Sequence, residues 1–348
     1  QLVERGAKRP RDRCQLVEGD PPVAGLDPAE GGGAQEAAGG QLVQRPAAGH
    51  PQPADPLPDQ GIEFTILRHT QDCMRLAQGR GSVGRMAHPE YTEMLDLDVE
   101  VLHEYHQTVI ALAGAAAPER PRIVDVGAGA GAGTLALARH LPDAEVIAVD
   151  VAEPMLDHLI GQARARGLDG RVRTVQADLD GPWPPLGPAD LVWASASLHH
   201  LADPGHAPAQ AFAMLRPGGV FVVTELDSFP RFLPDGADAA LEDRCHAALA
   251  ELRTEAGLHM HEDWGARLRA AGFTVEVQRR FDIALRAPLP AAAGRYAEVC
   301  LRRMCHGLDG RLAPGDLTAL TALADGVSGR TDLTVRAART VWLARRPA

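Results

Sequence analysis

The stretch PRIVDVGAGAGAGTLALARHL, residues 121–141, decides the fold. It begins as an apolar run, breaks into alternating glycines at Gly127, Gly129 and Gly131, and resumes with helical spacing over 134–141. Glycines between a buried strand and a helix let the backbone approach a ligand that any Cβ would obstruct. The N–H groups that open the following helix favour a carboxylate or a phosphate. The stretch therefore predicts a ligand-binding loop at the end of a strand.

The rest of the chain repeats this alternation of short apolar runs and helical patterns. Further strands are predicted over 144–150, 171–178, 189–196 and 220–226, with helices between them. Short β-branched runs joined by helices need crossover connections, which indicate a parallel sheet covered on both faces. We predict an α/β fold with a doubly wound sheet, in which ligands bind beyond the carboxyl ends of the strands.

The composition changes along the chain and predicts its domain organisation. Residues 1–60 hold nine glycines, nine prolines and no Phe, Trp or Tyr, so we expect a disordered low-complexity tail over 1–85. Helix-compatible spacing starts at Met86, and our hypothesis is that the functional chain starts near there, with a helical cap over 86–120. The main domain is predicted over 121–348, with helical insertions at about 227–264 and 288–328 that could serve as lids.

Charge and cysteine usage exclude several classes of protein. The net charge of −11 and the pI of about 5.7 argue against a groove that tracks nucleic-acid phosphates. No apolar run reaches the length of a membrane span, and none of the five cysteines forms a Cys-x-x-Cys pair. We therefore expect reduced thiols, a cytoplasmic location, and neither a nucleic-acid nor a membrane partner.

Three carboxylates lie at or near the ends of three successive predicted strands. Asp125 precedes the glycine loop and suits a cationic ligand. Asp150, 23 residues after Gly127, can accept two hydrogen bonds from the vicinal hydroxyls of a ribose. Asp178 can accept a hydrogen bond from an exocyclic adenine amine. Each residue alone is more often a surface or capping residue, but their joint placement at one crevice favours a nucleoside ligand.

At this point the chain resembles the class I S-adenosylmethionine-dependent methyltransferases of the bacterial small-molecule type. The resemblance rests on five ordered motifs: VDVGAGAG (124–131), VIAVD (146–150), VQADLDGPWP (175–184), ADLVWASASLHHLADP (189–204) and LRPGGVFVVTELD (215–227). It implies a Rossmann-like seven-stranded sheet whose last strand is antiparallel, with 272–285 and 334–346 as strands six and seven. It also implies S-adenosylmethionine as cofactor, S-adenosylhomocysteine as product and a small-molecule acceptor, with O-, N- and C-methylation left open.

The resemblance also implies roles for individual residues. Asp125, Gly127 and Gly129 would hold the methionine end of the cofactor, Asp150 the ribose, and Asp178 with Leu179 the adenine. Further cofactor-binding candidates on the same loops are Ala128, Gly131, Val151, Met155 and Ser195.

The histidines after the fourth strand are the candidate catalytic residues. Ser195, Ser197, His199 and His200 would line the methyl end, where a histidine could act as a base near neutral pH. The alternative is that SLHHL is a turn whose histidines cap and pack, and we favour this because the motif recurs in members with different substrates. We predict no metal site, and interpret His259, His261, Glu262 and Asp263 as a polar lid face.

Two other functions remain open at this stage. An NAD(P)-dependent oxidoreductase would share the glycine loop and Asp150, but it explains neither Asp178 nor LRPGG. A non-catalytic member of the family would bind the cofactor or a partner for regulation. The sequence also leaves the oligomeric state open, with a homodimer among the options.

Overall fold

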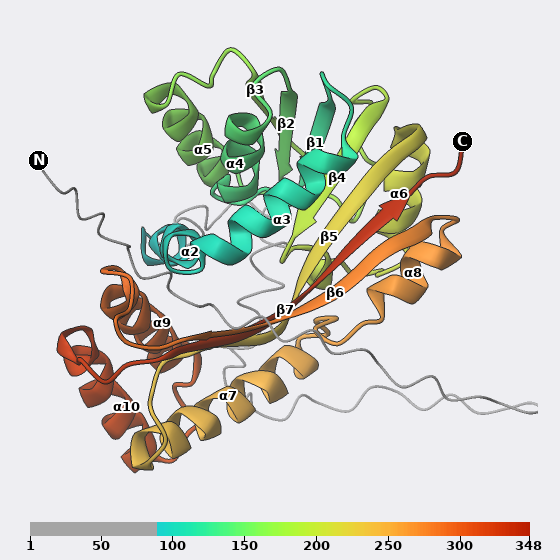
Figure 1. The fold of residues 1–348 in the computed structure, drawn as a ribbon. Coiled ribbons are helices and arrows are strands. Elements are labelled where there is room, and N and C mark those ends of the chain that lie inside the picture. Colours follow the sequence, from blue (N-terminus) through green and yellow to red (C-terminus); the bar gives the residue numbers. More distant parts are fainter. Residues whose placement is uncertain (1–88) are drawn as a thin grey trace, which may run out of the picture. The chain divides into compact units, whose positions relative to one another are not determined.

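The computed structural model describes residues 89–348, with side chains from residue 90, and its centre is a seven-stranded sheet in the order β3-β2-β1-β4-β5-β7-β6 (Figure 1). Strands β1 to β5 are mutually parallel, and β7 is antiparallel to both of its neighbours. The predicted α/β fold, with a mostly parallel sheet and an antiparallel last strand, is confirmed. The strands are β1 (Arg122–Val126), β2 (Glu145–Asp150), β3 (Val172–Gln176), β4 (Ala189–Ser195), β5 (Leu215–Arg231), β6 (Thr274–Leu285) and β7 (Val335–Arg345).

Helices cover both faces of the sheet, and the alternation of side chains along each strand explains why. On β4, Leu191 and Trp193 belong to one buried cluster, whereas Val192 and Ala194 belong to the other. The first cluster receives α2 (Pro89–Val101), α3 (His103–Ala116), α4 (Ala132–His140) and α5 (Glu153–Ala165). The second receives α6 (His206–Met214) and α8 (Trp264–Ala270).

Strands β5, β6 and β7 are longer than the others and run past the carboxyl edge of the parallel strands. The pairing of β4 with β5 ends at Ser195 and Thr224, while β5 continues along β7 as far as Arg231. Helices α7 (Ala237–Glu255), α9 (Ala293–Gly307) and α10 (Pro314–Gly326) gather around this far end (Figure 1). We call the ends of these strands together with α7, α9 and α10 the extension.

The structure changes the boundary of the insertion predicted at 227–264. Residues 227–231 are strand, with register shifts on either side of Ser228, because β7 supplies a hydrogen-bonding partner for them. Part of the segment that follows, up to residue 264, is buried in the core. Phe232 is fully buried, and Leu241 and Cys245 of α7 belong to the larger buried cluster. The segment thus contributes to the core, and its role as a lid stays a prediction.

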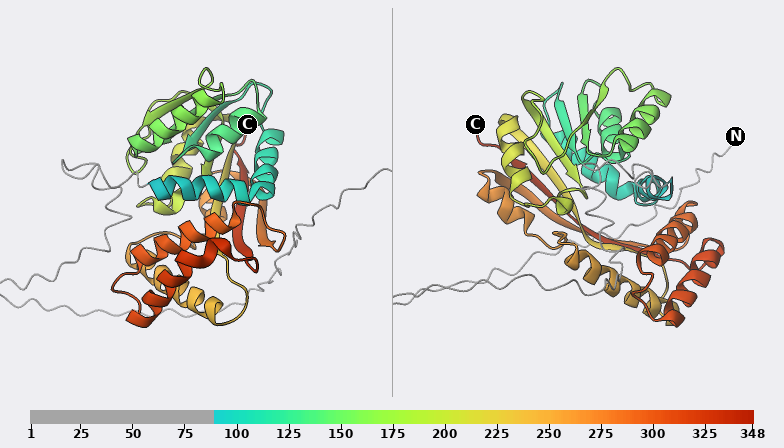
Figure 2. Two further views of the ribbon diagram at one scale, coloured as in Figure 1. Left: turned by 90° about the vertical axis from the view of Figure 1, so that its left-hand side faces the viewer. Right: turned by 180° about the vertical axis from the view of Figure 1, so that it is seen from behind.

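A buried polar network joins the N-terminal helices to the extension. The Asp98 carboxylate accepts hydrogen bonds from the Tyr296 hydroxyl and from Arg339, each at 2.5 Å, and lies 3.0 Å from Nε2 of His106. Burial alone would raise the pKa of Asp98, but Arg339 and His106 hold it well below its usual range. Helix α2 thus lies between α4 and α9 as an integral layer of the fold (Figure 2).

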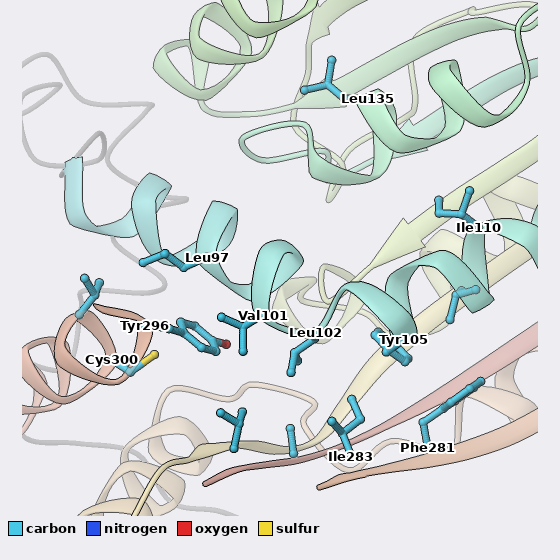
Figure 3. Packing of buried hydrophobic residues seen from close by; sticks show 14 of the residues in the cluster. Leu97, Val101, Leu102, Tyr105, Ile110, Leu135, Phe281, Ile283, Tyr296 and Cys300 are labelled. Carbon is cyan, nitrogen blue, oxygen red and sulfur yellow. The ribbon is translucent and has the colours of Figure 1, made fainter. Parts of the chain in front are cut away.

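Apolar side chains complete this joint. Leu97 and Val101 of α2 lie beside Tyr296 and Cys300 of α9, and Leu102, between α2 and α3, points towards the strands near Ile283 (Figure 3). The helical cap expected over 86–120 corresponds to α2 and α3 within the described residues, and the tail expected over 1–85 lies outside them. Between residues 89 and 348, no helix is both long and apolar enough to cross a bilayer.

We expect Glu242→Ala to lower the free energy of unfolding by about 3 kcal/mol, because hydrogen bonds to a charged group contribute about 1.5–3 kcal/mol each. The buried Glu242 carboxylate accepts hydrogen bonds from the backbone N–H groups of Phe232 (2.8 Å) and Leu233 (3.3 Å). Both residues are fully buried, so water cannot replace the carboxylate as acceptor. Urea unfolding measures the change. Glu251→Ala, an exposed substitution on the same helix, is the control, and equal losses in both variants would contradict the role of Glu242.

Candidate active site

The glycine loop between β1 and α4 has a left-handed backbone at all three glycines. The φ angles are +71° at Gly127, +51° at Gly129 and +89° at Gly131. A Cβ on Gly127 would come within 2.5 Å of Ser197, and one on Gly131 within 2.3 Å of Leu159. At Gly129 the nearest atom would be 3.7 Å away. Packing of the protein therefore requires two of these glycines, and Gly129 is the one whose backbone stays open to a ligand.

Asp150, at the end of β2, holds this loop in place. Its Oδ2 accepts the N–H of Gly129 at 2.8 Å, and its Oδ1 accepts the N–H of Ala152 at 2.9 Å. Burial raises the pKa of the carboxyl, and these two backbone bonds oppose the rise. A carboxylate offers about four acceptor positions, so two remain for further donors. Asp150 therefore fixes the loop by hydrogen bonds and is also a candidate ligand-binding residue.

Asp125 lies beneath the first turn of α4. It is only 2% exposed, and its Oδ2 accepts the Thr134 hydroxyl hydrogen bond at 2.6 Å. Burial raises its pKa to about 7; the Thr134 bond opposes the rise and the charge of Asp150 adds to it. The carboxylate is thus turned into the interior, and its contact with the methionine end of a cofactor stays a prediction.

The third predicted carboxylate is open to solvent. Asp178 follows β3, and its Oδ1 accepts the N–H of Asp180 at 3.0 Å, so its other oxygen is available to a ligand. Leu179 beside it is buried. Since β3, β2 and β1 are adjacent in the sheet, Asp178, Asp150 and Asp125 follow or end three neighbouring strands, as the motifs predicted.

The other cofactor candidates lie around the same edge of the sheet. Ala128 is half-buried in the glycine loop, and the Val151 carbonyl accepts a bond from Gln176 at 3.1 Å. Met155 on α5 is buried, with its sulfur 3.6 Å from the Thr92 hydroxyl of α2.

The end of β4 carries the remaining cofactor candidate. Oγ of Ser195 lies 2.9 Å from Oγ1 of Thr224. The next residue, Ala196, has a φ of +52°, which is strained for a residue with a Cβ. Such strain is often found at functional sites, and here it marks the segment where the methyl end is expected.

His199 forms a buried pair that the sequence did not indicate. Its Nδ1 lies 2.6 Å from Oε2 of Glu225, and Oε1 of the same carboxylate accepts the N–H of Leu198 at 2.9 Å. The carbonyl of His199 accepts the N–H of His259. Both side chains are almost fully buried, so Glu225 fixes the turn after β4. The sequence signal for this pair is Glu225 itself, a single carboxylate near the end of the apolar run VFVVTEL (220–226).

His200 is held in its neutral form. Burial lowers its pKa to about 3, and the nearby His199 and Arg253 add to the shift. The two histidine rings lie 4.1 Å apart. The geometry supports the capping and packing interpretation for His199, and the catalytic role of either histidine stays a prediction.

The polar residues near 260 have structural partners. The His259 N–H bonds the His199 carbonyl, Glu262 pairs with Arg267 at 2.9 Å, and Asp263 caps α8 through the N–H of Ala266. Within residues 89–348, no group of three or more His, Cys, Asp or Glu side chains could hold a metal ion.

Comparison with known proteins adds to this geometry. A family model described as "Methyltransferase domain" matches residues 123–219. The trans-aconitate 2-methyltransferase of Deinococcus radiodurans is 30% identical over 254 residues, which cover 70% of this chain and 81% of that protein. The chain belongs to the class I S-adenosylmethionine-dependent methyltransferase family. The family model spans the first four motifs and the start of the fifth, and so includes Asp178 and LRPGG, which an oxidoreductase would leave unexplained.

Other relatives match over shorter stretches. The demethylmenaquinone methyltransferase of Thermus thermophilus is 36% identical over 36% of this chain, and the trans-aconitate 2-methyltransferase of an Acidovorax species is 35% identical over 47%. The chain spans only 56% and 57% of the length of these two proteins.

Solved structures of two other proteins are also similar to the chain. A putative methyltransferase from Bacillus halodurans is 18% identical with a TM-score of 0.47, covering 70% of this chain and 99% of that one. For geranyl diphosphate C-methyltransferase from Streptomyces coelicolor the identity is 15%, the TM-score 0.44, and the coverage 80% and 98%.

We expect Asp125→Asn to remove a pH dependence from the stability. The folded pKa of about 7 lies above the unfolded value of about 3.9, so ionisation destabilises the folded state. The parent should lose stability relative to the variant as the pH rises from about 4 to about 7, by up to about 4 kcal/mol at about 1.4 kcal/mol per unit.

Urea unfolding of both proteins at about pH 5 and about pH 8 measures this difference. Asp157→Asn, at an exposed position on α5, should follow the parent. If the free energy of unfolding changed equally with pH in the parent and in Asp125→Asn, ionisation of the Asp125 carboxyl would not destabilise the fold, and the prediction would be wrong.

Proposed function

We propose that the protein transfers the methyl group of S-adenosylmethionine to a small-molecule acceptor. The observation that carries the proposal is the contact between Asp150 and the Gly129 N–H, which places a carboxylate with spare acceptor positions beside the most open backbone of the loop. The family assignment supports the same reading of this edge of the sheet.

The residues at this edge fit such a cofactor. Gly129 offers a cradle that a side chain would obstruct, and Gly131 caps α4 without a side-chain hydrogen bond, which suits an anionic group at the helix start. We assign the ribose to Asp150, the adenine to Asp178 and Leu179, and the methionine end to the loop of Gly127 and Gly129. Ala128, Gly131, Val151, Met155 and Ser195 would line the same groove.

The cofactor, when bound, supplies an electrophilic methyl group on a sulfonium. The protein's part is to position the acceptor, and good orientation can supply roughly 7–11 kcal/mol of a barrier. Glu225 and His199 fix the turn after β4, so they act as positioning residues for that end of the site. A base is needed only if the attacking group must lose a proton.

The acceptor is a small molecule in this proposal. The relatives named above act, by their names, on trans-aconitate and on demethylmenaquinone. They differ in the acceptor, so methyl transfer itself is the part that they share. We carry over only the class: a small organic acceptor bound beyond the ends of β4 and β5.

We expect Asp150→Ala to weaken S-adenosylhomocysteine binding at least tenfold, since two hydrogen bonds to a charged group contribute about 1.5–3 kcal/mol each. It should also lower the melting temperature, because the Gly129 and Ala152 N–H groups lose their acceptor. Asp150→Asn keeps an acceptor oxygen and should lose less of both.

Isothermal titration with S-adenosylhomocysteine and with NAD, and a thermal melt of each variant, measure these effects. Asp157→Ala is the matched control on the neighbouring helix, and NAD should bind none of the proteins. Unchanged affinity in Asp150→Ala would overturn the ribose assignment, and tight NAD binding by the parent would overturn the proposed function.

A further inference from the structure

Arg253, near the end of α7, carries a charge that nothing in the described part of the chain neutralises. Its guanidinium carbon lies 3.5 Å from the centre of the Phe229 ring, a cation–π contact, and no ion pair is formed with any carboxylate of residues 90–348. Burial lowers its pKa to about 10. By contrast, Arg244 on the same helix pairs with Asp316 at 2.7 Å, although it is exposed. A half-buried cation without an anion is unfavourable unless something else supplies one.

Two histidines with unused ring nitrogens lie within the field of this charge. Nδ1 of His200 and Nε2 of His246 are buried and have no hydrogen-bond partner. The whole His246 side chain is 8% exposed. Burial lowers the pKa of His246 to about 4, and the charges of Arg231 and Arg253 add to the shift, against opposition from Asp243 and the Pro230 carbonyl.

The backbone brings the end of α7 to the turn that holds His200: the carbonyl of Arg253 accepts the N–H of Leu258, and the next residue, His259, donates its N–H to the carbonyl of His199. A guanidinium without an ion pair, next to two neutral imidazoles, favours an anion and repels a cation or a metal ion. We call Arg253, His200, His246 and Phe229 the α7 cluster.

The α7 cluster lies on the acceptor side of the molecule. His200 belongs to the turn that follows β4, and Phe229 belongs to the part of β5 that runs past the carboxyl edge. His246 and Arg253 belong to α7, which packs on the same extension. The cofactor candidates lie instead at the ends of β1, β2 and β3. A ligand at the α7 cluster would therefore be a part of the acceptor.

We propose that the α7 cluster binds a carboxylate group of the methyl acceptor, an inference that rests on the proposed function. The single uncompensated charge of Arg253 matches a monoanion, since Arg231 already pairs with Asp243. A guanidinium presents paired N–H donors that suit a carboxylate. Nδ1 of His200 could donate to the same group in the tautomer that carries its proton there, which would satisfy that buried atom.

The test uses the full chain saturated with S-adenosylhomocysteine, and thermal melts at matched ionic strength. The probes are succinate, its uncharged diamide succinamide, and inorganic phosphate. Succinate should raise the melting temperature of the parent in a saturable manner, and succinamide should not. Arg253→Met should lose the response to succinate, while Arg244→Met, which removes the same charge from the same helix, should keep it.

Several results would overturn the proposal. These are an equal succinate response in all three proteins, no succinate response in the parent, or a response to phosphate in place of succinate. Arg253→Met should melt no lower than the parent without succinate, because it removes an unpaired charge. If that variant does not fold, Arg253→Gln carries the same test.

Titration with S-adenosylhomocysteine separates this proposal from the proposed function. The parent, Arg253→Met and Arg244→Met should bind it equally, because the α7 cluster lies apart from the cofactor residues. Failure of the parent to bind it would refute the proposed function, whereas intact binding without a succinate response would refute the carboxylate site alone.

Discussion

The hydrogen bond from the Gly129 N–H to Asp150 is the constraint on which the site depends. It links Gly129, the residue of the glycine loop with the most open backbone, to the end of β2. The position of the loop therefore depends on that of β2. Gly127 and Gly131 hold the loop from its other sides, through contacts with Ser197 and Leu159 that exclude a Cβ. A cofactor edge built in this way is already arranged before a ligand arrives, which reduces the ordering that binding must supply.

The second constraint is the length of β5, β6 and β7. Because β7 runs antiparallel between the other two, it supplies a partner for backbone that would otherwise end at the carboxyl edge. Arg339 on this strand and Tyr296 on α9 both bind Asp98 of α2, so the N-terminal helices are fixed to the extension. The extension, against which the proposed acceptor would lie, is thus tied to the N-terminal helices by buried contacts.

The features that depend on local pattern could be predicted from the sequence, and those that depend on distant partners could not. The strands β1 to β4, helix α4 and the placement of Asp150 and Asp178 followed from periodicity and from the motifs. The tail of β5 was missed because DSFPR lacks strand alternation and becomes strand only through β7. The burial of Asp125 against Thr134 and the pairing of Glu225 with His199 needed the folded chain.

Two arginines near the proposed acceptor site, the buried Arg339 and the half-buried Arg253, differ in how their charges are balanced. Arg339 is neutralised by Asp98 and serves the fold, whereas Arg253 has no carboxylate within the described residues and has only an aromatic ring beside it. An acceptor carboxylate bound by Arg253 would be a weaker nucleophile, because the guanidinium stabilises its negative charge. The anchored group and the methylated group should therefore be different. This favours acceptors with at least two functional groups, one held at α7 and one free to reach the end of β4.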